Sequence, residues 1–436
     1  MKKITLSILS IVSLLFACSR QDNNIGNTEI TKWQDGKTAA VSITYDDASI
    51  NQFRFALPIM DTLGFKGTFF INTVDIPQTE FPPKYFGRPI ADIVKETATK
   101  PTDQKNLFER ASALRFTGAE GVVESHNQAG SLYEQNKTAE AFKVIDEAYA
   151  KVRKQKSVKP TAPKLLDDAI TWPELKAFAA NGHEFGNHTI SHPRLSVLDE
   201  QNLLYELEKC KEEILKQLGP EHTFSAECPF GTENERVMEY AYKIHPALRN
   251  RMPEPFLEEL NRGSKANPGE SNKEYVQFQR GPLSKTPMEL MKSWVDTLLV
   301  HDNIWLVLTF HGVDGIGWEA NPHEKLAEYF RYMKEKEDRL WVAPFRDVTK
   351  YMRERMGAKV NVKEKGEKIA LDLTHSLDKD LYNHPLTLKT YVPSDWKEIK
   401  VTQGGKSLKS NLSTDEKGAF VLYDALPNAE VIEITQ

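Results

Sequence analysis

The stretch Ala39–Asn72 (AAVSITYDDASINQFRFALPIMDTLGFKGTFFIN) decides the fold class of this chain. Its first part, Ala39–Tyr45, is an apolar run with the length of a buried strand, and two aspartates follow it. A helical pattern over Ile50–Leu63 comes next, and Gly67–Asn72 is a second buried strand. Strand, helix and strand at this spacing predict a parallel α/β unit.

The same pattern continues later in the chain. The predicted elements are the helices Trp172–Ala180, Asp199–Leu218 and Asp347–Met356 and the strands Ile304–Phe310 and Leu340–Phe345. Ser196 and Asp199 predict a capping box at the start of the second helix. Repeated βα units with polar residues at the strand ends predict a distorted (β/α) barrel with its site at one rim.

Other segments interrupt this series or follow it. Residues 75 to about 170 are much longer than a connection within a βα unit, so a helical insertion or lid is expected there. A shorter interruption rich in Pro and Gly covers His245–Asn272. From residue 359 to 436, short alternating runs between turn residues predict a small all-β, sandwich-like module. The α/β domain is therefore assigned to residues 36–358.

The size and charge of the chain narrow its class. With 436 residues it exceeds one compact core, so two domains are expected. A formal net charge of -5 gives no support for nucleic acid as a partner. Cys210 and Cys228 could form one disulfide or remain two buried thiols, and the sequence leaves both open.

The first 18 residues have the pattern of a secretory signal. Two lysines precede the apolar run Ile4–Ala17, which is too short to span a bilayer as a stable helix. The run ends in LFAC, which looks like the lipobox of a bacterial lipoprotein. That resemblance implies lipidation of Cys18, a membrane partner and a lipid-anchored place in the cell envelope, at the outer membrane or the cell surface. An ordinary signal peptide with a coincidental cysteine is the alternative. Residues 19–35 would then be a flexible tether.

A polar cluster in HEFGNHTISHP (His183–Pro193) raises the question of a metal site. His188 and His192 lie four residues apart, one helical turn, so both imidazoles could share a metal. Catalytic zinc usually takes three protein ligands and keeps one position open. Asp46 and Asp47 close a buried strand, so one could bind the metal while the other faces a reacting water. The alternative for the aspartates is a capped turn before the next helix.

Four motifs together resemble one known family. TYDD at Thr44–Asp47, HTISHP at His188–Pro193, CPFG at Cys228–Gly231 and LTFHG at Leu308–Gly312 follow one another in the order found in polysaccharide deacetylases, carbohydrate esterase family four. The resemblance covers about residues 36–355 with the long insertion set aside. It implies an enzyme that hydrolyses acetyl groups on a glycan with a divalent metal, zinc being the expected ion.

The resemblance also implies roles for single residues. Asp46 corresponds to the general base and His311 to the general acid. Phe230 corresponds to the residue whose backbone N–H binds the oxyanion. The implied metal ligands are Asp47, His188 and His192. His183 has no counterpart in the motifs, so a structural role is expected for it.

The third motif departs from the family pattern. An arginine that orients the catalytic base usually precedes its proline, but this chain has Ala226-Glu227-Cys228 there. The fourth motif with its aspartate, which normally supports that arginine, is not recognisable. Arg280 could replace the arginine, or it could be a plain structural residue.

The expected function is removal of acetyl groups from a glycan, with N-acetyl groups of an amino-sugar polymer favoured. An O-acetyl esterase acting on a plant-type polysaccharide is one alternative. A glycan-binding lipoprotein without catalysis is another, although the presence of both aspartates and all three matching histidines favours the enzyme. The β module could also bind a partner in a sensor or an assembly. The sequence does not identify the glycan.

Overall fold

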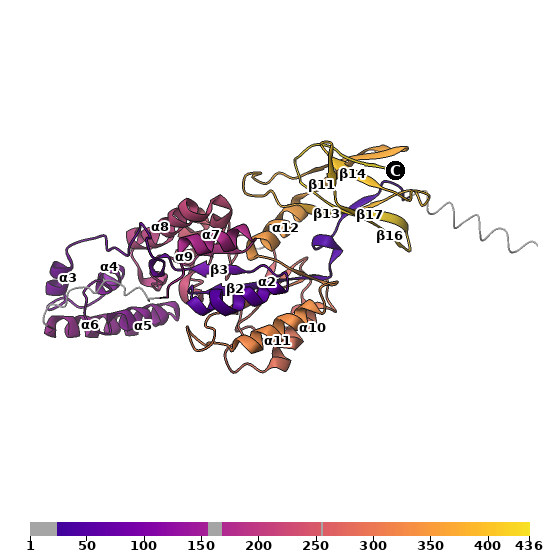
Figure 1. Cartoon of the computed structure of the whole chain (residues 1–436). Helices are drawn as coiled ribbons and strands as arrows, with labels where there is room; N and C mark the ends of the chain where they lie inside the picture. The colour runs from indigo at the N-terminus through magenta and orange to yellow at the C-terminus, as the bar shows by residue number, and fades with distance from the viewer. Residues whose placement is uncertain (1–23, 156–167, 254–255) are drawn as a thin grey trace, which may run out of the picture.

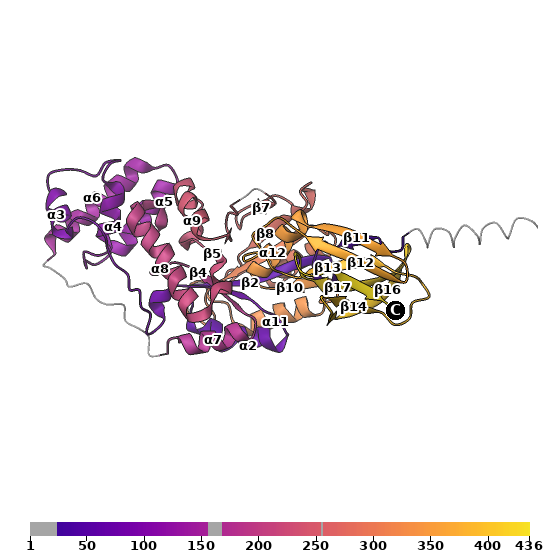
Figure 2. The ribbon, with the colours of Figure 1, turned by 90° about the horizontal axis from the view of Figure 1, so that it is seen from above.

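The computed structural model describes residues 24–155, 168–253 and 256–436. Two views at right angles show an elongated molecule, with a helical insertion at one end, a parallel sheet in the middle and antiparallel sheets at the other end (Figures 1 and 2). The predicted fold class, an α/β barrel-like domain with a helical insertion and a following all-β domain, is confirmed.

The central sheet has nine parallel strands in the order β6-β5-β4-β3-β2-β9-β8-β7, with β10 beside β2. They are β2 (Ala39–Asp46), β3 (Thr68–Ile71), β4 (Glu184–Asn187), β5 (Ser225–Ala226), β6 (Ala247–Leu248), β7 (Glu258–Leu260), β8 (Val276–Arg280), β9 (Ile304–Phe310) and β10 (Leu340–Val342). The order begins at β6 and ends at β7, so the described strands form a curled, open sheet. The expected interruption over His245–Asn272 is therefore wrong in part, because it supplies two of these strands.

Helices pack on the outer face of the curled sheet. They are η2 (a π-helical turn, Gln52–Ala56) running into α2 (Leu57–Thr62), then α7 (Trp172–Ala180), α8 (Glu200–Leu218), α9 (Glu235–Ile244), α10 (Met288–Leu298) and α11 (His323–Lys334). The last helix, α12 (Phe345–Gly357), packs on the inner face, where Phe345 shares a core with Ala40 and Trp305. Because side chains alternate along a strand, Val41 and Ile43 of β2 pack in the outer core while Ser42 and Thr44 face the inside. The same alternation turns Asp46 inward.

Shorter elements complete the domain. They are the 3-10 turns η1 (Gln34–Gly36), η3 (Thr73–Asp75), η4 (Leu195–Val197), η5 (Pro220–Thr223), η6 (Pro229–Gly231) and η7 (Pro268–Glu270). The capping box expected from Ser196 and Asp199 is wrong, because Ser196 lies in η4. Asp199 is itself the N-cap of α8, and its carboxylate accepts a hydrogen bond from the Asn202 N–H at 3.1 Å.

The insertion is a small helical subdomain with its own core. Its helices are α3 (Ile90–Glu96), α4 (Leu107–Leu114), α5 (Val122–Glu134) and α6 (Thr138–Lys154). Leu107, Ala129 and Ile145 are fully buried in this core together with Val197, which follows the HTISHP motif. The insertion is therefore packed against the loop that carries the candidate metal ligands.

The C-terminal strands form two sheets that pack as a sandwich. One sheet has the order β1-β13-β17-β16 and the other β11-β12-β18-β14-β15. The strands are β11 (Lys359–Lys365), β12 (Lys368–Thr374), β13 (Leu386–Tyr391), β14 (Lys400–Gln403), β15 (Lys406–Leu408), β16 (Ser410–Asp415), β17 (Gly418–Ala425) and β18 (Ile432–Thr435). Leu388 and Val421 of the first sheet share a core with Leu371 and Ile434 of the second.

The N-terminal segment belongs to this sandwich. β1 (Thr28–Ile30) pairs antiparallel with β13, in the register Thr28 opposite Thr390. The tether expected over residues 19–35 is therefore wrong for this part, because a strand of three residues is too short to recognise and is stabilised by its partner. Tyr351 of α12 is fully buried in the sandwich core. The signal, Cys18 and the first tether residues lie outside the described residues.

Two further expectations concern cysteines and membranes. Cys210 and Cys228 are both buried and unpaired, so they are two thiols rather than a disulfide. Within the described part of the chain, every helix is too short or too polar to cross a bilayer.

Candidate metal-dependent active site

The six residues singled out by sequence line one cavity of about 380 Å³: Asp46, Asp47, His188, His192, Phe230 and His311. Three strands deliver most of them, since β2 ends at Asp46, β4 ends just before His188 and β9 ends just before His311. Parallel strands place their carboxyl ends at one edge of a sheet, which explains how residues so far apart in the sequence meet.

A buried arginine holds Asp46. Nη1 and Nη2 of Arg249 each donate to one Asp46 oxygen at 2.7 Å, and Nη1 also donates to Thr44 Oγ1 at 2.7 Å. Burial alone would raise the pKa of Asp46, but the Arg249 guanidinium, with His311 and His188, outweighs it and holds that pKa well below its usual range. Asp46 is therefore a fixed, ionised carboxylate on the inner wall of the cavity.

Arg249 reaches Asp46 from the strand edge next to the third motif, where an arginine was expected. Ala226 of β5 is paired with Leu248 of β6, so the next residues, Glu227 and Arg249, come level at the sheet edge. Glu227 Oε1 lies 3.2 Å from Arg249 Nη2, which makes the site an Asp–Arg–Glu cluster. This arrangement is hard to predict, because β6 has only two residues and lies inside the expected interruption His245–Asn272.

Arg280 does not take this role. Its guanidinium donates to the backbone carbonyls of Gln279 and Ser264 and stacks 3.8 Å from the Phe278 ring centroid. The suggestion that Arg280 could orient the base is therefore wrong, and its structural alternative holds.

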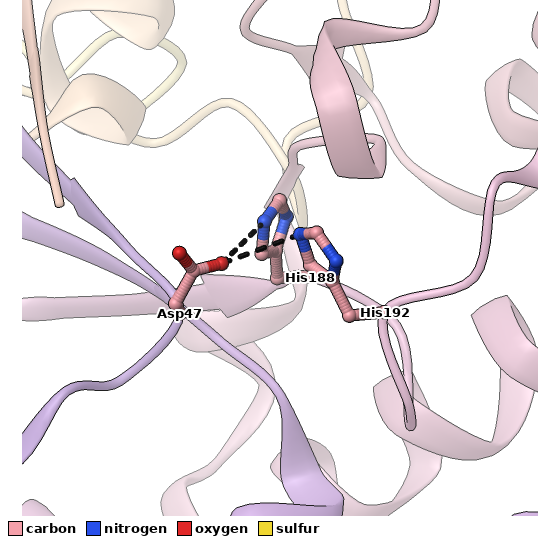
Figure 3. A group of neighbouring side chains, drawn as sticks. All are labelled: Asp47, His188 and His192. Carbon is pink, nitrogen blue, oxygen red and sulfur yellow. Dashed lines mark ion pairs between the residues drawn. The ribbon is translucent and has the colours of Figure 1, made fainter. Parts of the chain in front are cut away.

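Asp47, His188 and His192 converge on one point (Figure 3). Asp47 Oδ1 lies 3.5 Å from His188 Nε2 and 3.3 Å from His192 Nε2. Two ligand atoms that are each about 2.1 Å from a tetrahedral zinc lie about 3.4 Å apart. The spacing of this donor set therefore fits a small divalent ion.

The tautomer of His188 also fits a metal ligand. Its Nδ1 lies 2.8 Å from the Glu227 carbonyl oxygen, which can only accept, so Nδ1 carries the proton. Nε2 is then an unprotonated donor atom aimed toward Asp47. This carbonyl–histidine arrangement is the support that histidine ligands of metals usually have.

The loop between the two histidines is not the helical turn that their spacing suggested. Thr189 has φ 70° and His192 φ 53°, both in the left-handed region that a β-branched residue such as threonine rarely adopts. Asp47 itself has φ 74°. Such backbone strain requires support from neighbours and is concentrated at functional sites.

Hydrogen bonds from four neighbouring segments supply that support. The Asn187 carboxamide oxygen accepts from Thr189 N–H at 2.7 Å, and Asn72 donates to the His188 carbonyl at 2.6 Å. Glu206 of α8 accepts from both Ser191 N–H and Ser191 Oγ. Arg115, from the insertion, donates to the Ser191 carbonyl at 3.0 Å. The insertion thus helps to fix the ligand loop.

His311 stands opposite the ligand loop. Its Nε2 lies 3.5 Å from Asp46 Oδ2, and its ring meets Trp318 edge to face at 4.7 Å. Burial lowers the pKa of His311, and the nearby arginines add to this against the opposing pull of Asp46 and Asp47. Gln52 of η2 donates to the carbonyls of Asp46 and His311, which ties the ends of β2 and β9 together.

Phe230 forms the rim between the ligand loop and the third motif. It has φ 64°, its ring is 40% exposed, and it packs 4.6 Å from His192. The guanidinium carbon of Arg194 lies over the Phe230 ring, 4.3 Å from its centroid. Glu134 of α5 accepts from Arg194 at 2.6 Å and from Thr232 Oγ1 at 2.8 Å. One carboxylate of the insertion therefore connects both flanks of the Phe230 turn.

His183 lies apart from the cavity. Its Nδ1 accepts from the Gly67 N–H at 3.1 Å, and its Nε2 lies 3.0 Å from Asp61. These contacts tie the start of β4 to the start of β3 and to α2, so its expected structural role agrees with its position.

Residues 119–248 match the family model described as polysaccharide deacetylase. This range begins in the helical insertion and contains the second and third motifs, at His188–Pro193 and Cys228–Gly231. The match confirms the resemblance predicted from the motifs. The similarity to polysaccharide deacetylases thus rests on part of the α/β domain, including two of the four motifs.

Individual proteins are similar at low identity. A gellan lyase of Bacillus sp is 24% identical over 298 residues, which cover 62% of this chain and 11% of that protein. The chain thus spans about a tenth of the length of the curated relative that it matches. Two solved family 4 carbohydrate esterases are each 12% identical. The one from Bacillus anthracis covers 80% of this chain and 96% of its own, with a TM-score of 0.32. Bacillus subtilis PdaA covers 77% and 88%, with a TM-score of 0.33.

Proposed function

We propose that this protein is a metal-dependent hydrolase that removes acetyl groups from a glycan. The observation that carries the proposal is the cavity in which Asp46, fixed by Arg249, lies beside the donor set Asp47, His188 and His192 and faces His311. A divalent ion bound by this set, zinc by preference, would supply Lewis acidity at the acyl carbonyl.

The residues of the chain divide the remaining work. Arg249 occupies one lone pair of each Asp46 oxygen, and the others remain to accept a proton from an attacking water. His311 is placed to protonate the leaving atom, and its lowered pKa makes it a stronger acid once it carries a proton. The N–H of Phe230, at the cavity wall, would donate to the oxyanion.

We further propose that the substrate group is an N-acetyl group. An amine leaves only when it is protonated, and the cavity offers a histidine on the side opposite the ligand loop for that step. An O-acetyl ester needs this proton less, so an esterase acting on a plant-type polysaccharide remains the second candidate.

Acetate release tests the proposal. The wild-type chain should release acetate from an N-acetylglucosamine oligomer, lose this activity with a chelator and regain it with zinc. Asp46→Asn keeps the shape of the side chain but not its basicity, and should lower the rate about 100- to 10,000-fold while zinc stays bound. His311→Ala should reduce turnover of the amide more than that of an activated aryl acetate. Wild-type protein that binds the oligomer without releasing acetate would instead support the non-catalytic glycan-binding reading.

We also propose that the protein is anchored in the cell envelope through a lipid on Cys18. The support is the LFAC sequence that ends the apolar run. Cys18→Ser should move the protein from the membrane fraction to the soluble fraction or leave an uncleaved precursor. Unchanged membrane association of this variant would contradict the lipobox.

A further inference from the structure

Arg262 is a cavity residue that the proposed reaction does not use. It lies on the loop after β7 and lines the cavity together with Phe230 and Trp318. Two glycines make room for it. A Cβ on Gly231 would lie 2.9 Å from Arg262 Nη2, and a Cβ on Gly281 would lie 3.0 Å from its Cδ. Its side chain therefore runs across two glycine backbones toward the turn that carries Phe230.

Two neighbouring arginines, Arg194 in the cavity wall and Arg249 behind Asp46, are paired with carboxylates. Arg249 is paired with Asp46 and Glu227, and Arg194 is paired with Glu134 at 2.6 Å. Within the ranges 24–155, 168–253 and 256–436, no carboxylate lies within 4.0 Å of the Arg262 guanidinium, and it donates no hydrogen bond to another residue. Glu227 and Glu233 are near enough for its charge to act on them, but neither forms an ion pair with it. Arg262 thus brings an uncompensated positive charge to the cavity.

A partly buried guanidinium without a partner is unfavourable unless something supplies its acceptors. A planar guanidinium with several N–H groups matches a carboxylate in bidentate geometry. The exposed rings of Phe230 and Trp318 offer apolar surfaces for sugar rings at the same rim, being 40% and 56% exposed. The cavity therefore combines surfaces for sugar with one fixed cation.

We propose that Arg262 binds a carboxylate of the glycan, so that the substrate is an anionic polymer with an acid group close to the acetylated sugar. This proposal rests on the proposed deacetylase function and deepens it. The carboxylate can come from a uronic acid next to the acetylated sugar or from a lactyl ether on an amino sugar. Both present the same group to Arg262, and oligosaccharides of the two kinds distinguish them.

The first test compares a glycan with its own carboxyl-reduced form. The substrates are an oligosaccharide of alternating N-acetylglucosamine and glucuronate, the same material with each uronate reduced to glucose, and an oligosaccharide of N-acetylglucosamine and N-acetylmuramic acid with free lactyl groups. At least one acidic substrate should exceed the carboxyl-reduced one in kcat/KM by about 10- to 100-fold, the range of a charge-assisted hydrogen-bonded pair. The acidic substrate with the higher kcat/KM identifies whether the carboxylate belongs to a uronic acid or to a lactyl ether.

Variants assign the preference to Arg262. Arg262→Met should bring the ratio of acidic to reduced substrate close to one, and Arg262→Lys should keep part of it. Arg251→Met is the matched control, because Arg251 lies on the same segment but pairs with Glu235 at 2.8 Å and does not line the cavity. It should keep the wild-type ratio. No preference in the wild type, or a preference that survives in Arg262→Met, would overturn the proposal.

Binding separates this proposal from the proposed function. Calorimetry with the acidic and reduced oligosaccharides needs no turnover. If the wild type releases no acetate from any substrate, the deacetylase function fails. Tighter binding of the acidic oligosaccharide, lost in Arg262→Met, would still support the carboxylate site. Equal binding of both oligosaccharides would reject it.

Discussion

Arg249 contacts Asp46 from a different strand than the motif pattern predicted. Glu227 stands in the motif where an arginine was expected, and Arg249 faces it from the next strand. An arginine–carboxylate pair is thus present, and its cation directly follows β6 instead of lying in the third motif. The contact between Arg249 and Glu227 could not be predicted from the motifs, because it depends on a strand pairing that the sequence does not reveal.

Removing the Arg249 charge should damage both stability and rate. Arg249→Met leaves Asp46 and Glu227 buried without a cation, and breaking a buried pair costs about 3–5 kcal/mol. Acetate release should fall by about 100-fold or more, because the base loses its fixed position. Arg249→Lys should be intermediate. Urea unfolding and acetate assays measure both effects. Arg280→Met serves as the control, and equal losses in both arginine variants would contradict the assignment.

The six site residues were predictable because each follows a strand or lies in a motif of fixed spacing. The distances between these residues could not be predicted, since a loop with left-handed residues at Thr189 and His192 replaces the helical turn suggested by the spacing of the histidines.

Two histidine variants test the metal assignment. His188→Ala removes a donor aimed at Asp47 and should abolish most zinc binding. His183→Ala removes the contact with Asp61 and should cost about 1–3 kcal/mol of stability with zinc retained. Elemental analysis showing equal zinc loss in both variants would be inconsistent with the site.

At the scale of elements, long strands and helices were predicted well and short ones were not. β2 and β9 have eight and seven residues and are mostly apolar, so their burial could be predicted from the sequence. β5 and β6 have two residues each and owe their conformation to neighbouring strands. The insertion was recognised by its length and helical pattern, but its contacts with the site are made by individual side chains, Arg115 and Glu134, which that pattern does not reveal.

Glu134 should matter for turnover although it lies outside the deacetylase motifs. Glu134→Ala frees Arg194 and Thr232, so the Phe230 turn loses a support on both sides. We expect kcat/KM to fall by about 10- to 100-fold, as for a small misplacement of a reacting group. Zinc content should stay at the wild-type level, because the hydrogen bonds of Glu134 go to Arg194 and Thr232 and not to the three proposed ligands. Glu124→Ala, on the exposed side of the same helix, is the control. An unchanged kcat/KM for Glu134→Ala would mean that the insertion only packs against the domain.

At the scale of the whole molecule, the α/β domain and the sandwich pack against each other along one boundary. His384 lies in this boundary, with its ring near Trp341 and Tyr351 and its Nε2 2.9 Å from Gln34 Oε1. Burial lowers its pKa to about 4. The boundary was placed at residue 359 from composition, but the packing of Tyr351 across it could not be predicted from alternating patterns alone.

Acid should weaken this boundary. The unfolded chain takes up a proton at His384 below its ordinary pKa of about 6.5, whereas the folded chain resists until about pH 4. Stability is therefore fully present above about pH 6.5 and falls as the pH drops toward 4, by roughly 3 kcal/mol from this residue. His384→Gln should lose less stability than the wild type between pH 7 and pH 4.5, as measured by urea unfolding. The two curves should run parallel near pH 8, and parallel curves down to pH 4.5 would contradict the role of His384.

The pairing of β1 with β13 also fixes where an anchor would act. Asn24 donates to the Lys417 carbonyl, so the described chain begins on the sandwich, at the end of the molecule far from the helical insertion (Figure 1). Five residues separate it from Cys18, and an extended chain of that length reaches at most about 20 Å. With a lipid on Cys18, the sandwich would lie close to the bilayer surface and would separate the α/β domain from it. The proposed active site would then lie at a nearly constant distance from the membrane. Only glycan chains at that distance would be deacetylated.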